Sequence, residues 1–528
     1  MRRVMLSIWL IGSMLGLLVA CVAPSGQDGA APAGEKDEII FSALGDPNAM
    51  AEHPWSQLVE EYNAAHPEVE VVVVAGLGWD ALGTMILAGN APDLMHVSMA
   101  GIFSAVPQMP YAVNVAPYLT EEDIADFGPL FDNLRHPADP DHILGFPVEL
   151  RPEPEICANL DLFEEAGIDW QKIRAEGWTW DEFIEAAQKM TIDANGKHAN
   201  EADFDPENIA RWAWVDVRDG LAWQVGITMM NNGLAQFTGP GTASVGSQWD
   251  LTGPLAAESA QFVQDWLYKY HIADPATRAW GDPQFMQSFQ YLIDGRGAMN
   301  SFGGATCLGG VAMYNQAIDN GEIAGEKLEA RLWPLPTPYN AANMQSEVYS
   351  IRPIYLQMMS QEPYKGDKHT ENVVNFAKWF ISTETQIHLC KELSKAPCPL
   401  PARESVRSAI LTDPARLADI DYMLARGKSI PQLGHPANSL ISQQVWGPLI
   451  DQLLANEING EQFAEQLGQQ AQPFLDDWVN NATEQDAALI NIWCTIPSWF
   501  PGPHYPNYTP QISEACQAKV EELGIATQ

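Results

Sequence analysis

The chain has 528 residues, and its 68 acidic and 28 basic side chains give a formal net charge of −40 at pH 7. An acidic excess of this size argues against nucleic acid and against an anionic membrane surface as partners, and it disfavours a phosphorylated ligand. Hydrophobic residues make up 46% of the chain. Because a chain of this length exceeds what one hydrophobic core usually holds, we expect two domains or more.

The N-terminus has the features of an exported protein. A basic start at residues 1–3 precedes a nearly uninterrupted apolar run from 4 to 20, which ends in Leu-Val-Ala-Cys21. The run is a little short for a membrane-spanning helix, which is the alternative, and its ending resembles the bacterial lipobox. We therefore expect a signal peptide at 1–20, lipid on Cys21 and a flexible tether at 21–36. The body would then lie at the outer face of the bacterial cytoplasmic membrane, at the cell surface or in the periplasm.

The six remaining cysteines fit the oxidising compartment that export implies. Six cysteines allow many pairings. Their spacing favours two local disulfides and leaves one long-range pair: Cys390–Cys398, Cys494–Cys516 and Cys157–Cys307. Buried free thiols are the alternative. No Cys-x-x-Cys or His-x-x-x-His spacing occurs in the chain, so we expect neither a metal site nor a cofactor.

The start of the body predicts a βαβ unit. Strand patterns at 38–44 and 69–74 flank a helical pattern at 54–65. One face of this helix carries four apolar side chains, Trp55, Leu58, Val59 and Tyr62. A further helix is expected at 80–88 and a further strand at 94–98. The order strand, helix, strand with short links implies that the first two strands pair in parallel.

Six segments follow one another in an order that is typical of one protein family. They are AGNAPDLMHVS at 88–98, the hinge-like stretch at 145–169, GWTWDEFIEAAQKMT at 177–191, LIDGRGAMNSFGG at 292–304, LWPLPTP at 332–338 and a late helix pair at 377–406. Together they resemble the extracellular solute-binding proteins of ABC importers, in the maltose-binding-protein-like group. The resemblance covers most of residues 38–478. It departs from the family at Ala158, where the family has tyrosine, and after residue 480.

The resemblance implies an α/β fold of the two-lobed, type II periplasmic-binding-protein kind, with mostly parallel sheets flanked by helices. We expect the first lobe to take residues 38–148 and 298–350, and the second to take 149–297 and 351–480. The chain would cross between the lobes more than once. Residues 481–528 have no counterpart in the family, and they are too apolar for a free tail. We expect them to fold back as a C-terminal extension packed on the body.

The same resemblance implies a binding function. A ligand would sit between the lobes, and a monomeric body would deliver it to an ABC permease in the membrane. A carbohydrate is the implied ligand, and a peptide, polyamine or glycerophosphodiester is the alternative. The sequence contains no nucleophile elbow, zinc-protease motif, phosphate loop or dinucleotide fingerprint. We therefore expect no enzymatic activity, and a secreted glycan-active hydrolase with paired carboxylates is the less favoured alternative.

A sugar presents apolar C–H faces and a rim of hydroxyls, so aromatic rings, carboxylates and amides are its expected partners. The candidate ligand-binding residues, on predicted loops at strand ends, are Asp46, Trp79, Glu149, Arg151, Trp223, Trp280, Gly303, Gly304 and Glu347. The wider set also holds Asp216, Asn231 and Trp333. The two glycines directly follow a predicted strand, where backbone N–H groups can approach a ligand closely. Core packing is the alternative for each tryptophan, and a solvated surface is the alternative for each acid.

Two local motifs have structural interpretations. Thr179 and Glu182 predict a capping box at the start of a helix. Residues 193–196, Asp-Ala-Asn-Gly, resemble part of a calcium loop, but the remaining ligands are absent and a type I′ turn is favoured.

Overall fold

The three-dimensional structure is a computed structural model. It describes residues 36–43, 54–75, 85, 91–97, 112–128, 131, 134–136, 139–153, 155–216, 218–232, 234, 248–249, 251–274, 291–301, 307, 315, 318–319, 321, 324, 332–336, 338–339, 350–361, 364–393, 400–412, 414, 416–418, 420–421, 437–495 and 512–525. The predicted signal peptide, the predicted lipidation site Cys21 and nearly all of the predicted tether lie outside these residues, as do most of the predicted helix at 80–88 and Cys398.

The first sheet has six strands and is built on the predicted βαβ unit. Their order across the sheet is β13 (Leu400–Pro401), β6 (Phe146–Glu153), β12 (Ser350–Met358), β3 (Leu94–Val97), β1 (Asp37–Ala43) and β2 (Val69–Ala75). β1 pairs in parallel with β2, as predicted, and also with β3. Helix α1 (Pro54–Ala65) joins β1 to β2 and buries the four predicted apolar side chains, because their spacing puts them on one face.

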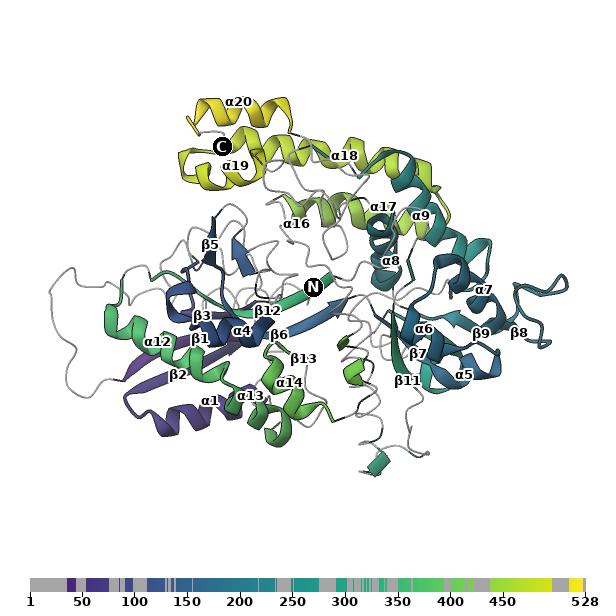
Figure 1. The fold of residues 1–528 in the computed structure, drawn as a ribbon. Helices are drawn as coiled ribbons and strands as arrows, with labels where there is room; N and C mark the ends of the chain where they lie inside the picture. Colours follow the sequence, from purple (N-terminus) through teal and green to yellow (C-terminus); the bar gives the residue numbers. More distant parts are fainter. Residues whose placement is uncertain are drawn as a thin grey trace, which may run out of the picture.

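Helices around this sheet complete the first lobe (Figure 1). Besides α1 they are α4 (Glu121–Phe127), α12 (Asp367–Phe380), α13 (Thr383–His388) and α14 (Glu404–Ile410), with short turns η3 (Ala116–Tyr118) and η5 (Leu389–Leu393). The ring of Phe41 in β1 packs against Trp55 of α1 and against Phe376 and Phe380 of α12. A small two-stranded sheet is formed by β4 (Arg135–His136) and β5 (Asp139–Ile143).

The second sheet has five strands, in the order β11 (Leu332–Pro336), β7 (Glu155–Asn159), β10 (Gly297–Asn300), β9 (Ile209–Trp214) and β8 (Ile192–Asp193). The helices of the second lobe are α5 (Leu160–Glu165), α6 (Trp170–Glu176), α7 (Trp180–Met190), α8 (Arg218–Asn231), α9 (Gly253–Tyr268), α16 (Asn438–Ile441), η6 (Ser442–Trp446), α17 (Gly447–Leu454) and α18 (Gly460–Asn481). No helix in the described ranges has both the length and the apolar character to span a membrane.

The core of the second lobe is aromatic. Trp266 of α9 lies with its ring centroid 5.3 Å from that of Trp214 in β9 and 4.9 Å from that of Phe183 in α7. Helix α7 begins with the predicted capping box, since Glu182 N–H donates to the Thr179 hydroxyl and Thr179 N–H donates to the Glu182 carboxylate. The cap therefore fixes where this helix starts, and packing of its apolar face orients it on the sheet.

The predicted division of the chain between the lobes is wrong for several segments. β10 and β11 belong to the second sheet, although 298–350 was expected in the first lobe. β12 belongs to the first sheet and α12 packs on β1, although 351–480 was expected in the second lobe. Of that segment, α17 and α18 pack with α9, and α16 packs with α18. A strand pattern does not show which sheet the strand joins, because sheet membership depends on pairing with distant strands.

Both sheets are mixed, although the sequence predicts mostly parallel ones. Parallel pairing among the described strands joins β1 to β2 and β3, and β9 to β10. The reason is the way the chain returns between the lobes. β6 and β7 carry it from the first sheet to the second, and β11 and β12 carry it back, so each returning strand lies antiparallel to an outgoing one.

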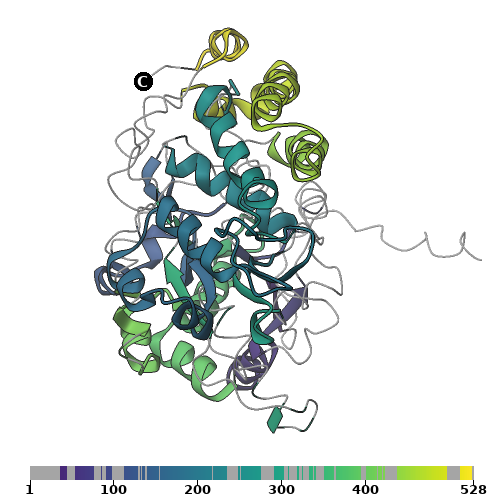
Figure 2. The same cartoon turned by 90° about the vertical axis from the view of Figure 1, so that its right-hand side faces the viewer.

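The C-terminal extension is folded and packs on α18. Its described helical segments are η7 (Glu484–Asp486), α19 (Ala487–Cys494) and α20 (Glu514–Glu522). A small apolar cluster joins Val479 of α18 to Ile490 of α19 and Val520 of α20. In both views α20 lies at the outer end of the molecule, on the far side of α18 from the two sheets (Figures 1 and 2), and Figure 1 shows α19 beside α18.

Two of the three predicted disulfides lie wholly within the described residues and are confirmed. Cys494–Cys516 joins α19 to α20, and Cys157–Cys307 joins β7 to a segment beyond β10. Cys390 is also disulfide-bonded.

The turn at 193–196 differs from the predicted type I′ turn. Gly196 has φ of +80°, but Ala194 and Asn195 are not in the left-handed region that a type I′ turn requires. Gly196 N–H donates to Asp193 O, and Asp193 N–H donates to Lys197 O, so the glycine follows the turn. The Asp193 carboxylate accepts the N–H groups of Asn195 and Lys197 and therefore shapes the loop.

Candidate functional site

The directions of the strands bring the carboxyl edges of both sheets to the same junction. β6 ends where the chain enters the second sheet, and β12, antiparallel to it, lies between β6 and β3. β3, β1 and β2 therefore run in the same direction as β6 and end on the side of the second sheet. β7 starts at the junction, and β10 is antiparallel to β7 and parallel to β9. β9 and β10 thus end at the junction too.

This arrangement defines the candidate site. In open α/β sheets, ligands bind beyond the carboxyl ends of the parallel strands. Here two such edges face one junction, and two antiparallel strand pairs connect the sheets there (Figure 1). Residues that come after β1, β2, β3, β9 and β10 in the sequence are therefore the ones that can reach a ligand from both sides.

On the second sheet, Asp216 occupies this edge. Val215 N–H continues the ladder by donating to Met299 O, and Ser301 N–H donates to Asp216 Oδ2 over 3.1 Å. The Asp216 side chain is only 2% exposed. A Cβ on Gly220 would stand 2.2 Å from the Asp216 carboxyl, so the carboxyl lies against the first turn of α8. Asp216 therefore links the ends of β9 and β10 and places a negative group at a helix N-terminus.

Several predicted site residues are not on loops. Glu149 lies inside β6, opposite Ile354 and Pro401, and is 5% exposed, because β6 continues to Glu153. Trp223 lies within α8 and packs, half-buried, against the main apolar core. Glu149 and Trp223 therefore lie within regular elements and not at the expected strand ends. Their role in ligand binding stays a prediction.

The wider set is also spread over regular elements. Arg151 lies in β6, and Asn231 is the last residue of α8. Trp333 lies in β11, where the guanidinium of Arg174 stands 5.5 Å above its ring and covers one face. Asp46, Trp79, Trp280, Gly303, Gly304 and Glu347 lie outside the described residues. Sequence position alone places Asp46 after β1, Trp79 after β2 and the two glycines after β10.

The glycines of the GRGAM segment are explained by packing and turn geometry. Gly295 has φ of +69°, which favours glycine at this turn before β10. A Cβ on Gly297 would stand 2.3 Å from Val215 Cγ2, so only glycine lets β10 approach β9 this closely. These residues therefore set the position of β10.

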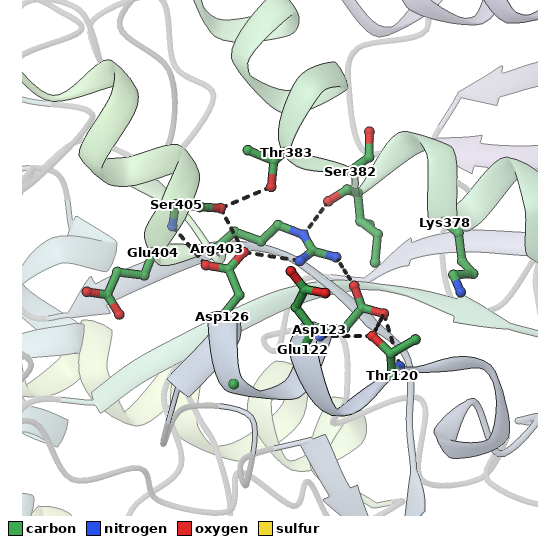
Figure 3. A pocket seen from close by; sticks show the side chains of 12 residues that line it. Thr120, Glu122, Asp123, Asp126, Lys378, Ser382, Thr383, Arg403, Glu404 and Ser405 are labelled. Carbon is green, nitrogen blue, oxygen red and sulfur yellow. Dashed lines mark hydrogen bonds and ion pairs between the residues drawn. The ribbon is translucent and has the colours of Figure 1, made fainter.

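A second polar region is a groove of about 780 Å³ on the first lobe (Figure 3). Arg403 crosses it, with Nη2 2.6 Å from Asp123 Oδ1 and Nη1 3.1 Å from Asp126 Oδ2. Ser405 N–H and its hydroxyl also donate to Asp126. Burial raises the pKa of both aspartates, but hydrogen bonds outweigh it. They come from Arg403 and Thr120 at Asp123 and from Ser405 and Arg403 at Asp126, so both pKa values lie below their usual range. These charges bind one another and hold α4 to α14.

Sequence reasoning did not anticipate either of these polar links. The sequence predicts Asp216 only as a ligand partner, and the signal for its structural role is its position two residues after β9. The Arg403 contacts join residues more than 270 positions apart, which no local pattern reveals. Among the described residues, no group of three or more His, Cys, Asp or Glu side chains is arranged to hold a metal ion.

Comparison with known proteins agrees with this geometry. The family profile described as "Bacterial extracellular solute-binding protein" matches residues 51–387, more than half of the chain. No curated protein sequence matches the chain.

Three solved structures illustrate the shared fold. UspC of M. tuberculosis is 19% identical with a TM-score of 0.55, and the match covers 83% of this chain and 100% of UspC. Maltose-bound MalE3 of T. maritima is 14% identical with a TM-score of 0.58, covering 82% and 98%. The GacH receptor of Streptomyces glaucescens is 15% identical with a TM-score of 0.58, covering 84% and 99%.

The two mixed sheets, the paired crossings and the facing carboxyl edges are the two-lobed, type II binding-protein fold that the sequence predicts. With the profile match, they establish that this chain belongs to the family of bacterial extracellular solute-binding proteins, which serve ABC transporters.

Proposed function

We propose that the chain is the substrate-binding lipoprotein of an ABC importer, which captures a mono- or oligosaccharide between its lobes and delivers it to the permease. The observation that carries this proposal is that the carboxyl edges of both sheets face the junction where the strands cross. A ligand bound there can contact both lobes. Solved structures with this fold include proteins in complex with tagatose, maltose and acarbose.

The charge at the junction favours an uncharged ligand over a phosphorylated one. A helix N-terminus attracts anions, but at α8 the carboxyl group of Asp216 already lies against the first turn. A phosphate placed there would meet a like charge, in a chain whose net charge is −40. Sugar hydroxyls, which donate as well as accept hydrogen bonds, suit such a site better.

Closure of the lobes would couple binding to transport. The crossing strands lie side by side, since Pro336 is opposite Glu155 and Ser350 is opposite Glu153. A hinge at this narrow connection lets the lobes move as units. Ligand favours the closed state only because it contacts both lobes there, and the permease would then recognise the closed form.

We assign the ligand contacts to the predicted residues that come after the parallel strands, above all Asp46, Trp79, Gly303 and Gly304. Trp223, Trp280, Glu149, Arg151 and Glu347 complete the candidate set. Mutation of Trp79 to alanine should weaken sugar binding roughly tenfold or more if its ring stacks on the sugar. An unchanged affinity would remove Trp79 from the site.

The deciding experiment is calorimetry of the mature body against maltose, maltotriose, acarbose and tagatose. Triglycine, spermidine and glycerophosphocholine serve as the non-sugar arm. We expect tight binding of at least one sugar and no binding in the other arm. Binding only in the non-sugar arm would overturn the ligand class, and chromatography that shows a cleaved sugar would establish a hydrolase.

The membrane anchor is tested separately. Two acyl chains or more hold a protein stably on a membrane where one does not, at about 0.8 kcal/mol per buried CH₂. We expect Cys21→Ala to abolish lipid labelling and Cys-dependent processing while ligand affinity persists. Release of the wild-type protein without lipid would overturn the anchor.

A further inference from the structure

A short parallel segment extends the second sheet next to β9. Trp214 N–H donates to Ile272 O over 2.8 Å, and Asp274 N–H donates to Trp214 O over 3.0 Å. Trp214 therefore pairs in parallel with Ala273, on the side of β9 that faces away from β10. Because the segment runs in the same direction as β9, Asp274 comes at the carboxyl edge of the sheet, where the candidate ligand site lies.

The end of α9 fixes where this segment enters the sheet. Ile272 N–H and Ala273 N–H both donate to Trp266 O in the last turn of α9, over 2.8 and 3.2 Å. His271, the residue before them, has φ of +52°, a left-handed conformation that non-glycine residues adopt uncommonly. Such residues persist only where the surrounding structure holds them, and they cluster at functional sites. The backbone of Asp274 is thus held both by α9 and by β9.

Asp274 is the point where this segment leaves the core. Ile272 and Ala273 are fully buried, whereas Asp274 is half-buried. Two other polar side chains of the same edge, Asn300 at the end of β10 and Asp216 after β9, are at most 2% exposed. Asp274 is therefore the most accessible of these three side chains.

We propose that Asp274 is a further ligand-binding residue, whose carboxylate accepts hydrogen bonds from hydroxyl groups of the bound sugar. This role rests on the proposed function, and it gives the second lobe a ligand contact of its own. An ionised carboxylate only accepts hydrogen bonds, and its two oxygens suit neighbouring hydroxyls of one sugar ring. Hydrogen bonds to an ionised acceptor are about twice as strong as neutral ones. Asp274 therefore favours neutral ligands rich in hydroxyls and disfavours phosphorylated ones.

The test compares Asp274 with an acid at the opposite edge of the same sheet. The variants are Asp274→Ala and Asp274→Asn, which keeps the size of the side chain. The matched control is Asp294→Asn, because Asp294 precedes β10 at the amino edge and pairs with Arg296 at the surface. The probe is the tightest-binding sugar among maltose, maltotriose, acarbose and tagatose, measured by calorimetry. Urea unfolding of the free proteins measures their stability in parallel.

We expect Asp274→Ala to bind the sugar roughly tenfold more weakly than wild type, and Asp274→Asn to lie between the two. Both variants should unfold at the wild-type urea concentration, since a contact made only with ligand does not stabilise the free protein. The control should keep its affinity within about twofold, because salt screens a surface charge at the opposite edge.

Wild-type affinity in Asp274→Ala would overturn the role of Asp274 and leave the proposed function intact. An equal loss of affinity in the control would also overturn this role, because it would reflect the charge of the whole protein. If the alanine variant fails to fold, the asparagine variant decides, and wild-type affinity there would overturn the role. A wild-type protein that binds none of the four sugars would overturn the proposed function, and the role of Asp274 with it.

Discussion

The imidazole of His369 and the carboxylate of Asp93 are 2.9 Å apart, from Nε2 to Oδ1, and both side chains are buried. The other imidazole nitrogen lies 2.6 Å from Asp37 Oδ1, and Lys365 Nζ lies 2.7 Å from Asp93 Oδ1. Asp37 begins β1 and Asp93 precedes β3, so this cluster ties α12 to the amino edge of the first sheet. The cluster lies at the opposite edge of the sheet from the candidate ligand site, so it stabilises the fold and does not contact the ligand.

The cluster makes stability depend on pH. Burial lowers the pKa of His369, but its hydrogen bonds to Asp93 and Asp37 outweigh burial and raise the pKa above its ordinary value. The imidazolium therefore stabilises the fold fully below its unfolded pKa, about 6.5, and this contribution is lost as pH rises through the raised folded pKa. For Asp93 burial raises the pKa, but bonds from His369, Lys365 and Ile40 lower it overall. Its contribution is lost as pH falls through the lowered value.

We predict that His369→Asn lowers the free energy of unfolding by about 1–3 kcal/mol at mildly acidic pH and by less at alkaline pH. Urea unfolding of both proteins between about pH 6 and pH 9 measures this difference. His388→Asn is the control, because His388 also pairs with carboxylates but is 30% exposed, so solvent screens it. Parallel pH profiles for wild type and His369→Asn would contradict the prediction.

Arg403→Lys should destabilise the first lobe. The planar guanidinium reaches Asp123 and Asp126 at once and also donates to Ile381 O, which a single ammonium group cannot reproduce. We expect a loss of about 1–3 kcal/mol in urea unfolding. The control is Arg211→Lys, which alters the ion pair between Arg211 and Glu165, a side chain that is 57% exposed. The free energy of unfolding of this variant should fall by about 0–1 kcal/mol. Similar losses of stability in the two variants would show that burial of the ion pair does not determine its contribution.

Gly297→Ala should destabilise the second lobe because the new Cβ would stand 2.3 Å from Val215 Cγ2. We expect a loss of about 1–3 kcal/mol in thermal or urea unfolding. Val215→Ala removes the methyl groups that clash, so the double variant should lose less than the sum of the two single losses. If the loss in the double variant equals the sum of the two single losses, the alanine at position 297 and Val215 are not in contact.

The extension should open locally when its disulfide is removed. Lys519 of α20 is 8% exposed, and its ammonium donates to Ala482 O, just beyond α18. Without Cys494–Cys516 we expect about 2–4 kcal/mol less local stability and faster tryptic cleavage after Lys519. Mass spectrometry of the fragments measures the rate. The Cys157→Ala/Cys307→Ala variant should be cut at the wild-type rate, and faster cutting there would show that the extension is coupled to the second sheet.

Local features of the sequence determined the local structure. The apolar spacing of α1, the alternation of strand and helix up to β2, the cap at Thr179 and the local pair Cys494–Cys516 all arise from residues whose pattern is itself the physical cause. The family, too, was apparent from ordered motifs. These features need only neighbouring residues, or a comparison of motif order, to be recognised.

Tertiary structure alone decided which strands share a sheet and which polar groups meet. β10, β11 and β12 each belong to the other lobe than the one predicted for them. Glu149 lies inside a strand and not at its end. Asp216 is held by Ser301, 85 positions away, and His369 by Asp93, 276 positions away. The free energy of such contacts depends on chain segments that approach only after the sheets form, so no pattern within a short window carries the information.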